Sequence, residues 1–442
     1  MNHLTAISYL PVLTWFCLIL TLAMLLYGVI LSRYLFVKPS MIFALFFHVQ
    51  IQWPSALYWT KIASNLTNPL AYFILAQIFP LLLVAGSILI GRHIARQVYD
   101  RVVNLPRSSY GEAFLPILPL ALISLTILAW YLTTVPWEKM GLHAVIYDPE
   151  NAKLAREHSL KLLTNKYLKY AVSIFNSSLA PVLACLIGIK MLDNWQQKKY
   201  PYLGLYLVCL APILLAVSLS GARGPSAMIL LAVFFLMLLI KGLPLQPVRI
   251  VLVLALILAV PGMVELLRAG GAFNPAEMRL RYAVIIERAI GYGMTQDAQW
   301  HIEYVTKYGY WGIAGVERLA PLFGIKPIDI MNVVGKIYTN TQPLASVSAN
   351  ASMIFIYYAC FGWIALPLCL LLAWLLDATL YIYNQMQTIM LPVAIAACGI
   401  SVVNLAHTAY TTIFITHGFL IILTMCFVCD KSIVKLRSKE IS

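Results

Sequence analysis

Residues 378–429 read ATLYIYNQMQTIMLPVAIAACGISVVNLAHTAYTTIFITHGFLIILTMCFVC, a run of 52 residues without Asp, Glu, Lys or Arg. A helix needs about 20 apolar residues to cross the hydrocarbon core of a bilayer, so this run is long enough for two crossings. An open segment satisfies its backbone hydrogen bonds there only as a helix. The run therefore predicts membrane-spanning helices.

The rest of the chain has a similar composition. Of its 442 residues, 61% are hydrophobic and only 11% are charged, and the mean hydropathy is +0.83. Soluble domains carry about 25% charged residues. The composition predicts an all-α, polytopic membrane protein with one integral membrane domain over residues 1–442, and no nucleic acid is expected as a partner.

Division of the apolar runs at turn signals predicts about eleven spans. They are residues 7–31, 41–57, 70–90, 114–135, 168–191, 202–219, 226–240, 250–266, 351–382, 388–405 and 410–429. The ninth is longer than a bilayer requires, so it must tilt, kink near Pro367 or extend beyond the membrane. All eight cysteines lie in or at the end of these spans, which predicts neither an outer disulfide nor a metal cluster.

The distribution of Lys and Arg predicts the orientation of the spans. Fifteen of these cations fall on alternate short connections and the C-terminal tail, and short basic connections stay on the cytoplasmic side. The C-terminus is therefore expected in the cytoplasm and the N-terminus outside. Two longer segments, residues 136–167 and 267–348, are expected to face outward.

The outer segment 267–348 carries eight Lys or Arg in an otherwise apolar protein. Its sequence PAEMRLRYAVIIERAIG, residues 275–291, predicts a helix that begins at Asn274, with Pro at the first helical position. Arg281 and Arg288 share one stripe of that helix, and Arg279 lies near them. Two interpretations stay open: an interfacial helix whose arginines meet acids or lipid headgroups, and an arginine clamp for pyrophosphate.

Two further arginines stand beside small residues. Arg223 lies in SGARGPS, residues 220–226, between two predicted spans, and Arg268 precedes Ala269, Gly270 and Gly271. Neighbouring glycines allow a ligand to approach the backbone closely. A cation at membrane level is costly and indicates a functional site, although a side chain that reaches the interface explains it as well.

These motifs support a family resemblance. The motif SGARGPS lies between two spans, LLRAGGAF and RLRYAVIIERAIG open the large outer segment, and APLFGIKP precedes the next span. This layout resembles that of bacterial Wzy-type oligosaccharide repeat-unit polymerases. The resemblance implies a GT-C-like, metal-independent glycosyltransferase without a cofactor, in the inner membrane with its large loop in the periplasm. It would transfer a growing glycan from undecaprenyl pyrophosphate to an incoming lipid-linked repeat unit.

The resemblance also implies roles for residues. Arg223 matches the small-Arg-small arginine of the family and Arg288 the arginine of its loop helix, with Arg268 and Arg281 carried over beside them. The implied partners are the lipid-linked glycans, membrane lipids and a chain-length regulator.

An acceptor hydroxyl needs a general base, and carboxylates and histidines follow the arginines. Glu287, Asp297, His301 and Glu303 all lie in ERAIGYGMTQDAQWHIE. Asp297 and His301 are four residues apart and would share a helical face, as an oriented pair or as a surface hydrogen bond. His407, at the outer end of the tenth predicted span, is expected either to contact sugar or phosphate or to be a structural histidine.

Other functions remain open on the sequence. An O-antigen ligase shares the lipid donor and differs chiefly in its acceptor. A flippase or anion transporter would favour internal repeats and charges within spans, whereas no repeat is evident and the spans carry almost no charges away from their ends. A membrane O-acyltransferase does not explain the external arginines. A glycosyltransferase with monophosphate donors would place acids in the first outer loop, where residues 60–68 have none.

Overall fold

The computed structural model describes residues 3–30, 32–106, 111–147, 163, 165–197, 199–219, 224–241, 292–339 and 349–441. Every regular element within these ranges is a helix, and none is a strand. The predicted all-helical membrane class is therefore confirmed. Six of the described helices are long and apolar enough to cross a membrane: Tyr9–Gly28, Pro69–Leu89, Gly111–Thr134, Lys166–Asn194, Met353–Tyr383 and Tyr410–Lys439.

The remaining predicted spans differ in length or lie elsewhere. Three of them coincide with shorter apolar helices, Val208–Ser218, Pro225–Ile240 and Met390–Ala406. Residues 41–57 are helical but are not among the six. The predicted span 250–266 lies outside the described residues. A total of eleven spans therefore stays a prediction.

The chain divides into two compact units. The first contains Met1–Gln97, Val284–Tyr381 and Val402–Phe414, and the second contains Val98–Ala283, Ile382–Ser401 and Ile415–Ser442. Each unit is thus assembled from segments far apart in the sequence.

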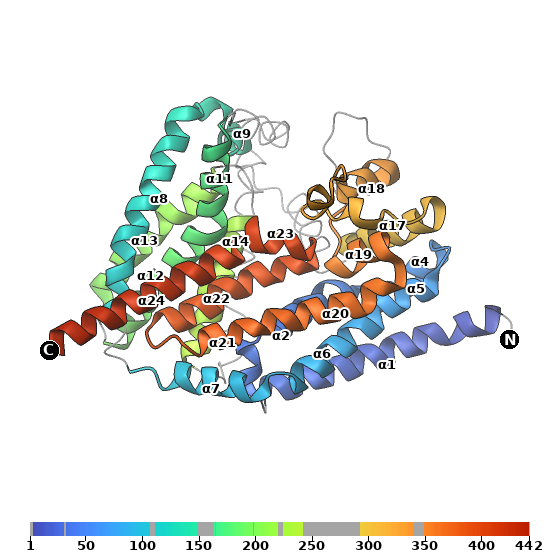
Figure 1. Cartoon of the computed structure of the whole chain (residues 1–442), viewed down its shortest axis with the longest axis horizontal. Helices are drawn as coiled ribbons and strands as arrows, with labels where there is room; N and C mark the ends of the chain where they lie inside the picture. Colours follow the sequence, from blue (N-terminus) through green and yellow to red (C-terminus); the bar gives the residue numbers. More distant parts are fainter. Residues whose placement is uncertain are drawn as a thin grey trace, which may run out of the picture. The chain divides into compact units, whose positions relative to one another are not determined.

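Long apolar helices form the body of the first unit. Helix α6 packs against α1, α2 and α20, and α1, α6 and α20 run alongside each other (Figure 1). The helices of this unit before residue 98 are α1 (His3–Ile30), η1 (Arg33–Val37), α2 (Pro39–Phe47), η2 (His48–Gln52), α3 (Trp53–Leu57), α4 (Trp59–Ser64), α5 (Pro69–Phe73), η3 (Ile74–Ile78), α6 (Phe79–Leu89) and the start of α7 (Arg92–Val103). Those after residue 291 are α17 (Tyr292–Tyr308), η7 (Gly312–Gly315), η8 (Ala320–Phe323), α18 (Ile330–Thr339), α19 (Met353–Phe361), η9 (Gly362–Ile364), α20 (Ala365–Leu375), η10 (Leu376–Ala378), most of α21 (Thr379–Tyr383), η11 (Asn404–Ala406) and most of α23 (Tyr410–Ile415).

Among the described residues, three helices contain a π-helical turn, and each of these turns is followed by a proline. The π turns η2, η3 and η6 (Phe175–Leu179) end two residues before Pro54, Pro80 and Pro181 respectively. A proline inside a helix lacks an N–H and its ring clashes with the carbonyl of residue i−4. The wider π turn accommodates the proline without ending the helix.

The predicted ninth span, residues 351–382, is not one straight helix. The sulfur of Cys369 lies 3.8 Å from the carbonyl oxygen of Met353, whereas 16 residues of continuous helix would extend about 24 Å. The chain reverses at Gly362, whose φ is +61°. A Cβ atom there would lie 2.9 Å from the ring of Tyr310. None of the three alternatives, tilt, a kink near Pro367 or extension beyond the membrane, describes this reversal, which folds α19 back onto α20. Within the candidate span Met353–Tyr383, the part that continues in one direction therefore begins at Gly362.

A buried ion pair joins three elements of the first unit. The Lys38 ammonium lies 3.1 Å from the Asp377 carboxylate, and both side chains are buried. Asp377 accepts hydrogen bonds from the backbone N–H and the hydroxyl of Ser40, at 3.0 and 2.7 Å. Lys38 also donates to the carbonyls of Ser87 and Ile90. The charges are fully paired, which is the condition under which ions are tolerated inside a protein.

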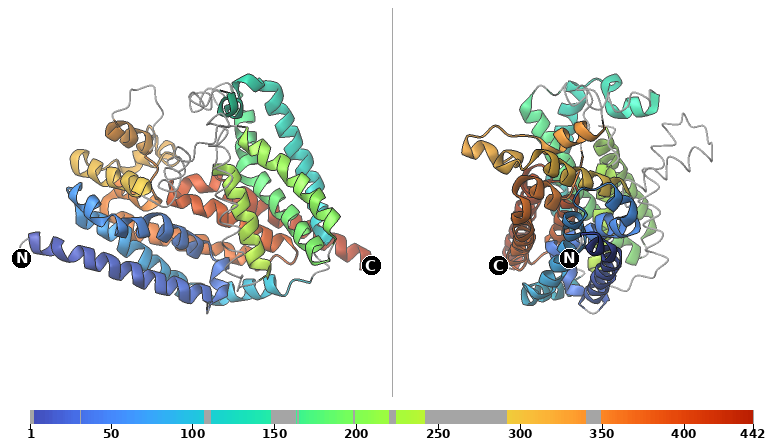
Figure 2. Two further views of the ribbon diagram at one scale, coloured as in Figure 1. Left: turned by 180° about the vertical axis from the view of Figure 1, so that it is seen from behind. Right: turned by 90° about the vertical axis from the view of Figure 1, so that its right-hand side faces the viewer.

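The second unit is a group of helices around α12 (Figure 2). Its α8 (Phe114–Thr134), α13 (Tyr200–Ser218) and α14 (Gly224–Lys241) all pack on α12 (Ala180–Gln196). Asp430, in α24, accepts hydrogen bonds from the backbone N–H groups of Gln387 and Thr388, at 2.9 and 2.8 Å. The other elements of this unit are the end of α7, η5 (Trp137–Lys139), α9 (Gly141–Tyr147), α11 (Lys166–Ile174), η6, most of α22 (Met390–Val403) and α24 (Phe419–Ile441).

Candidate functional site

The structure describes only part of the predicted site. Asp297 and His301 lie on α17, and His407 follows η11. The predicted helix that begins at Asn274 lies outside the described residues, and so do six of the predicted site residues: Arg223, Arg268, Arg279, Arg281, Glu287 and Arg288. The proposed arginine clamp therefore stays a prediction.

Helix α17 is held in the first unit by an apolar stripe. Met294, Ala298, Ile302 and Val305 are buried, and their spacing of three or four residues places them on one face of the helix. The helix packs against α19 and α18, and against α3, α5 and η2 of the N-terminal segment. This packing fixes residues 292–308 of the predicted outer segment onto other helices of the first unit.

His301 is a fully buried, neutral histidine on α17. Its Nδ1 atom lies 2.8 Å from the backbone carbonyl oxygen of Asp297, and because a carbonyl only accepts, Nδ1 carries the proton. Nε2 then holds a lone pair, and it has no hydrogen-bond partner among the described residues. Burial lowers the pKa of His301 to about 4. His301 thus bonds to the backbone carbonyl of Asp297, and it is buried rather than at the surface.

The carboxylate of Glu303 ties α17 to the loop between α4 and α5. It accepts hydrogen bonds from the backbone N–H and the hydroxyl of Thr67, the latter at 2.7 Å. The side chain of the next residue, Asn68, accepts from the N–H of Ala71 at 3.0 Å and caps α5. Glu303 is 7% exposed. Its surroundings indicate an anchor for α17 rather than a base for an incoming hydroxyl.

Aromatic side chains gather around α17 and the segments that follow it. Trp300 stacks on Tyr338 with ring centroids 5.9 Å apart, and Tyr304 stacks on Trp311 at 5.3 Å. Burial, with a smaller contribution from Glu303, raises the pKa of Tyr338 to about 12, so its phenol stays protonated. Tyr308 is 61% exposed. Exposed aromatic faces of this kind can pack against the apolar faces of sugars.

His407 lies just after η11, near the beginning of α19. Its backbone N–H donates to the carbonyl of Asn404 at 2.9 Å, and its side chain is half-buried. The adjoining Leu405 carbonyl accepts a hydrogen bond from Ser352 at 3.0 Å. His407 is therefore positioned by a turn that is bonded to the entry of α19.

The first unit also contains neutral polar side chains inside its predicted spans, which a count of formal charges does not detect. His48, Gln52 and Gln77 are buried in the first unit and bond to one another or to backbone. In the sequence these residues stand out as HVQIQ, residues 48–52, and AQ, residues 76–77, within runs that contain no charged residue. Neutral polar side chains in such runs indicate buried hydrogen bonding, because hydrocarbon offers them no partner.

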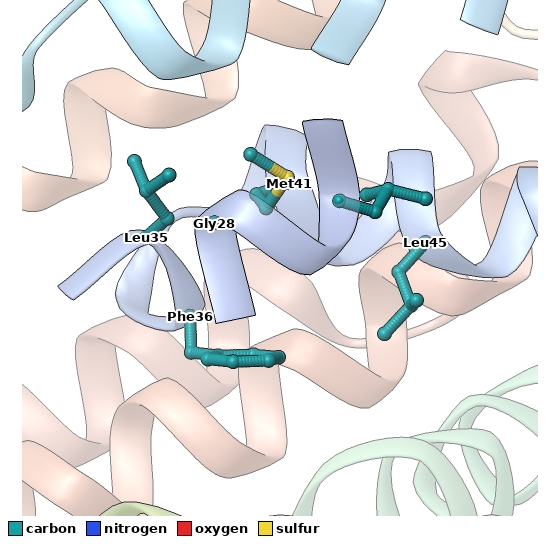
Figure 3. A pocket seen from close by; sticks show the side chains of 6 residues that line it. Gly28, Leu35, Phe36, Met41 and Leu45 are labelled. Carbon is teal, nitrogen blue, oxygen red and sulfur yellow. The ribbon is translucent and has the colours of Figure 1, made fainter. Parts of the chain in front are cut away.

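Figure 3 shows an apolar pocket between α1, η1 and α2. The pocket offers no charged or polar side chain that could bind a phosphate or a sugar. It is lined by Leu25, Gly28, Leu35, Phe36, Met41 and Leu45.

The described residues contain no group of three or more His, Cys, Asp or Glu side chains that could hold a metal ion. No protein-family model, no curated protein and no solved structure matches the chain. The assignment of function therefore rests on the residues and on the layout of the chain.

Proposed function

We propose that this protein is an oligosaccharide repeat-unit polymerase, a glycosyltransferase that works at the outer face of the bacterial inner membrane. It lengthens a glycan carried on undecaprenyl pyrophosphate, within a GT-C-like arrangement of about eleven spans. The observation that carries the proposal is α17. Its aromatic surroundings and its Asp297 and His301 follow directly after the arginine-rich sequence in the same predicted outer segment.

Arginines supply the recognition of pyrophosphate in this proposal. Arg223, Arg268, Arg279 and Arg281 bind its oxygens, since a guanidinium donates two parallel hydrogen bonds and keeps its charge at any relevant pH. Arg288 stabilises the negative charge that develops on the leaving pyrophosphate. These roles extend the resemblance described above to the numbered residues of this chain.

Asp297 is the better general base of the two described candidates. Its side chain is half-buried, whereas His301 is fully buried. A general base must reach the proton of the acceptor hydroxyl, and the burial of His301 prevents this contact. In the proposed step, Asp297 takes the proton of the acceptor hydroxyl, whose oxygen attacks the anomeric carbon of the donor. The bond from that carbon to pyrophosphate breaks, and His301 positions Asp297 through its backbone carbonyl.

Glu287 and His407 complete the proposed site. Glu287, which precedes Arg288 in the sequence, is a further carboxylate that can take the proton of the acceptor hydroxyl. His407 contributes a contact to the glycan or the phosphate. A chain-length regulator and membrane lipids are the further partners that we propose.

Deletion of the gene, followed by gel analysis of surface glycan, tests the proposed function. A polymerase predicts loss of the long ladder while the product with a single repeat unit remains. Loss of all capped product would indicate an O-antigen ligase or a flippase instead. An unchanged ladder would refute the proposal.

Point variants test the assigned residues in the same assay. Arg288→Ala and Asp297→Asn should each reproduce the deletion with normal membrane abundance. Arg318→Ala, in the outer segment but outside the proposed site, is the matched control and should keep the ladder. Full activity of Arg288→Ala or Asp297→Asn would remove that residue from the site.

A further inference from the structure

The two π turns of the first unit are joined by a reciprocal pair of hydrogen bonds. The Gln52 side-chain amide donates to the backbone carbonyl of Gln77 at 3.3 Å, and the Gln77 side-chain amide donates to the backbone carbonyl of Gln52 at 3.2 Å. Both side chains are completely buried. Since π turns interrupt the regular helical hydrogen-bond ladder, each glutamine supplies a donor to the other interrupted helix.

The bonds around Gln52 fix the direction of every donor in this cluster. Thr21 donates to the carbonyl of Cys17 at 2.8 Å, so its hydroxyl oxygen accepts from Gln52, 3.1 Å away. The nitrogen of the Gln52 amide therefore faces Thr21 and Gln77, and its oxygen faces His48. His48 Nδ1 lies 2.7 Å from that oxygen and must carry the proton. Nε2 of His48 is then an acceptor.

Three buried acceptor atoms of these turns have no partner among the described residues. They are Nε2 of His48, Oε1 of Gln77 and Oε1 of Gln50. An acceptor that is removed from water without a replacement hydrogen bond costs on the order of 1–3 kcal/mol. Each of these atoms therefore favours a hydrogen bond from a donor other than the described side chains, and the buried Nε2 of His48 is the clearest case.

The chemistry of the cluster selects a neutral donor. Acceptor atoms repel an anion, so pyrophosphate does not fit. A bare cation does not fit either, because the groups that bond to one another in the cluster are all neutral and none balances its charge. A neutral hydroxyl donor satisfies the acceptors without moving a charge into the membrane. Water is the smallest such donor and commonly binds to buried polar groups in proteins.

We propose that Nε2 of His48, in the first of the two paired π turns, accepts a hydrogen bond from an ordered water inside the membrane. The water supplies hydrogen bonds that the apolar helices around the cluster cannot. This site joins α1, the α2–α3 helix and the α5–α6 helix through polar contacts. It is independent of the proposed transfer reaction.

Nitrogen-15 NMR of the full-length protein in lipid nanodiscs tests this proposal, with the histidines labelled. The signal of His48 is identified among the eight histidines by its loss in His48→Asn. We expect a proton on Nδ1, no proton on Nε2, and a cross-peak from Nε2 to protons that exchange with bulk water. A proton on Nε2, or no contact with exchangeable protons, would overturn the site. A cross-peak to a lipid hydroxyl instead of water would overturn the assignment of water.

A pair of variants tests the direction of the hydrogen bonds. Gln52→Leu removes the acceptor that holds the proton on Nδ1 of His48, so the tautomer should shift toward Nε2–H. Ser64→Ala removes an exposed hydroxyl that bonds only within its own helix, to the carbonyl of Lys61, and should leave the signal unchanged. An unchanged tautomer in Gln52→Leu would contradict the assigned network. The spectrum of the unsubstituted protein, assigned with His48→Asn, decides the proposal even where Gln52→Leu does not fold.

Discussion

Single buried residues determine how this protein responds to pH. His301 is buried, and among the described residues no group bonds to its Nε2. Burial disfavours the charged form of the imidazole and keeps it neutral. Its folded pKa of about 4 lies below the ordinary value of 6.5. The unfolded chain therefore binds a proton at a higher pH than the folded protein does. The stability is complete above pH 6.5 and decreases as the pH falls toward 4.

This difference predicts that acid destabilises the protein through His301. Between pH 7 and pH 5 the free energy of unfolding should fall by about 2 kcal/mol because of this residue. Thermal unfolding in detergent at the two pH values measures the change. His301→Gln should lose less stability on acidification than the unsubstituted protein. His93→Gln, at an exposed position, is the control. Equal losses in all three proteins would contradict the account of His301.

The buried ion pair gives a second prediction at the residue scale. Lys38→Met leaves the Asp377 carboxylate buried beside Ser40 without its cation, which should cost about 3–5 kcal/mol of stability. The double variant Lys38→Met with Asp377→Leu removes both charges and should recover much of that loss. Thermal unfolding of the single and double variants measures the difference. A double variant that is less stable than the single one would show that the pair is not coupled as described.

At the scale of elements, the reversal at Gly362 shapes the first unit. Gly362→Ala would place a methyl group 2.9 Å from the ring of Tyr310 at a backbone φ of +61°. We expect a loss of more than 1 kcal/mol in stability, because a residue with a side chain is strained at this φ. Gly204→Ala in α13 is the matched control. A Cβ atom there meets nothing within 4 Å, and alanine should stabilise the helix slightly.

Thermal unfolding and membrane abundance of the two glycine variants measure this effect. If the Gly362→Ala variant is as stable as the Gly204→Ala variant, the chain does not reverse at Gly362.

The elements also show how far sequence reasoning reaches. The charge-free runs predicted helices correctly, because apolar length alone decides whether a segment is suited to the membrane. For the ninth run, tilt, a kink near Pro367 and extension beyond the membrane were all left open. The reversal at Gly362 was not predicted, because it depends on Tyr310, which is distant in the sequence. The burial of His301 depends in the same way on packing by other elements. The polar π turns were missed because only formal charges were counted.

At the scale of the whole molecule, the central claim is that the protein joins lipid-linked repeat units into a longer glycan. The described residues support a membrane protein with an anchored, aromatic-rich α17 in its predicted outer segment. The proposed reaction releases undecaprenyl pyrophosphate each time a repeat unit is added. Glycan length and released carrier must therefore rise together.

Reconstitution of the purified protein into liposomes tests this claim most directly. The liposomes contain undecaprenyl-pyrophosphate-linked repeat units, and mass spectrometry follows glycan length and the released carrier. We predict products of two or more repeat units, with one carrier released for each linkage formed, and no products with Arg288→Ala. Repeat units that stay single, while the same liposomes support elongation by an established polymerase, would contradict the account.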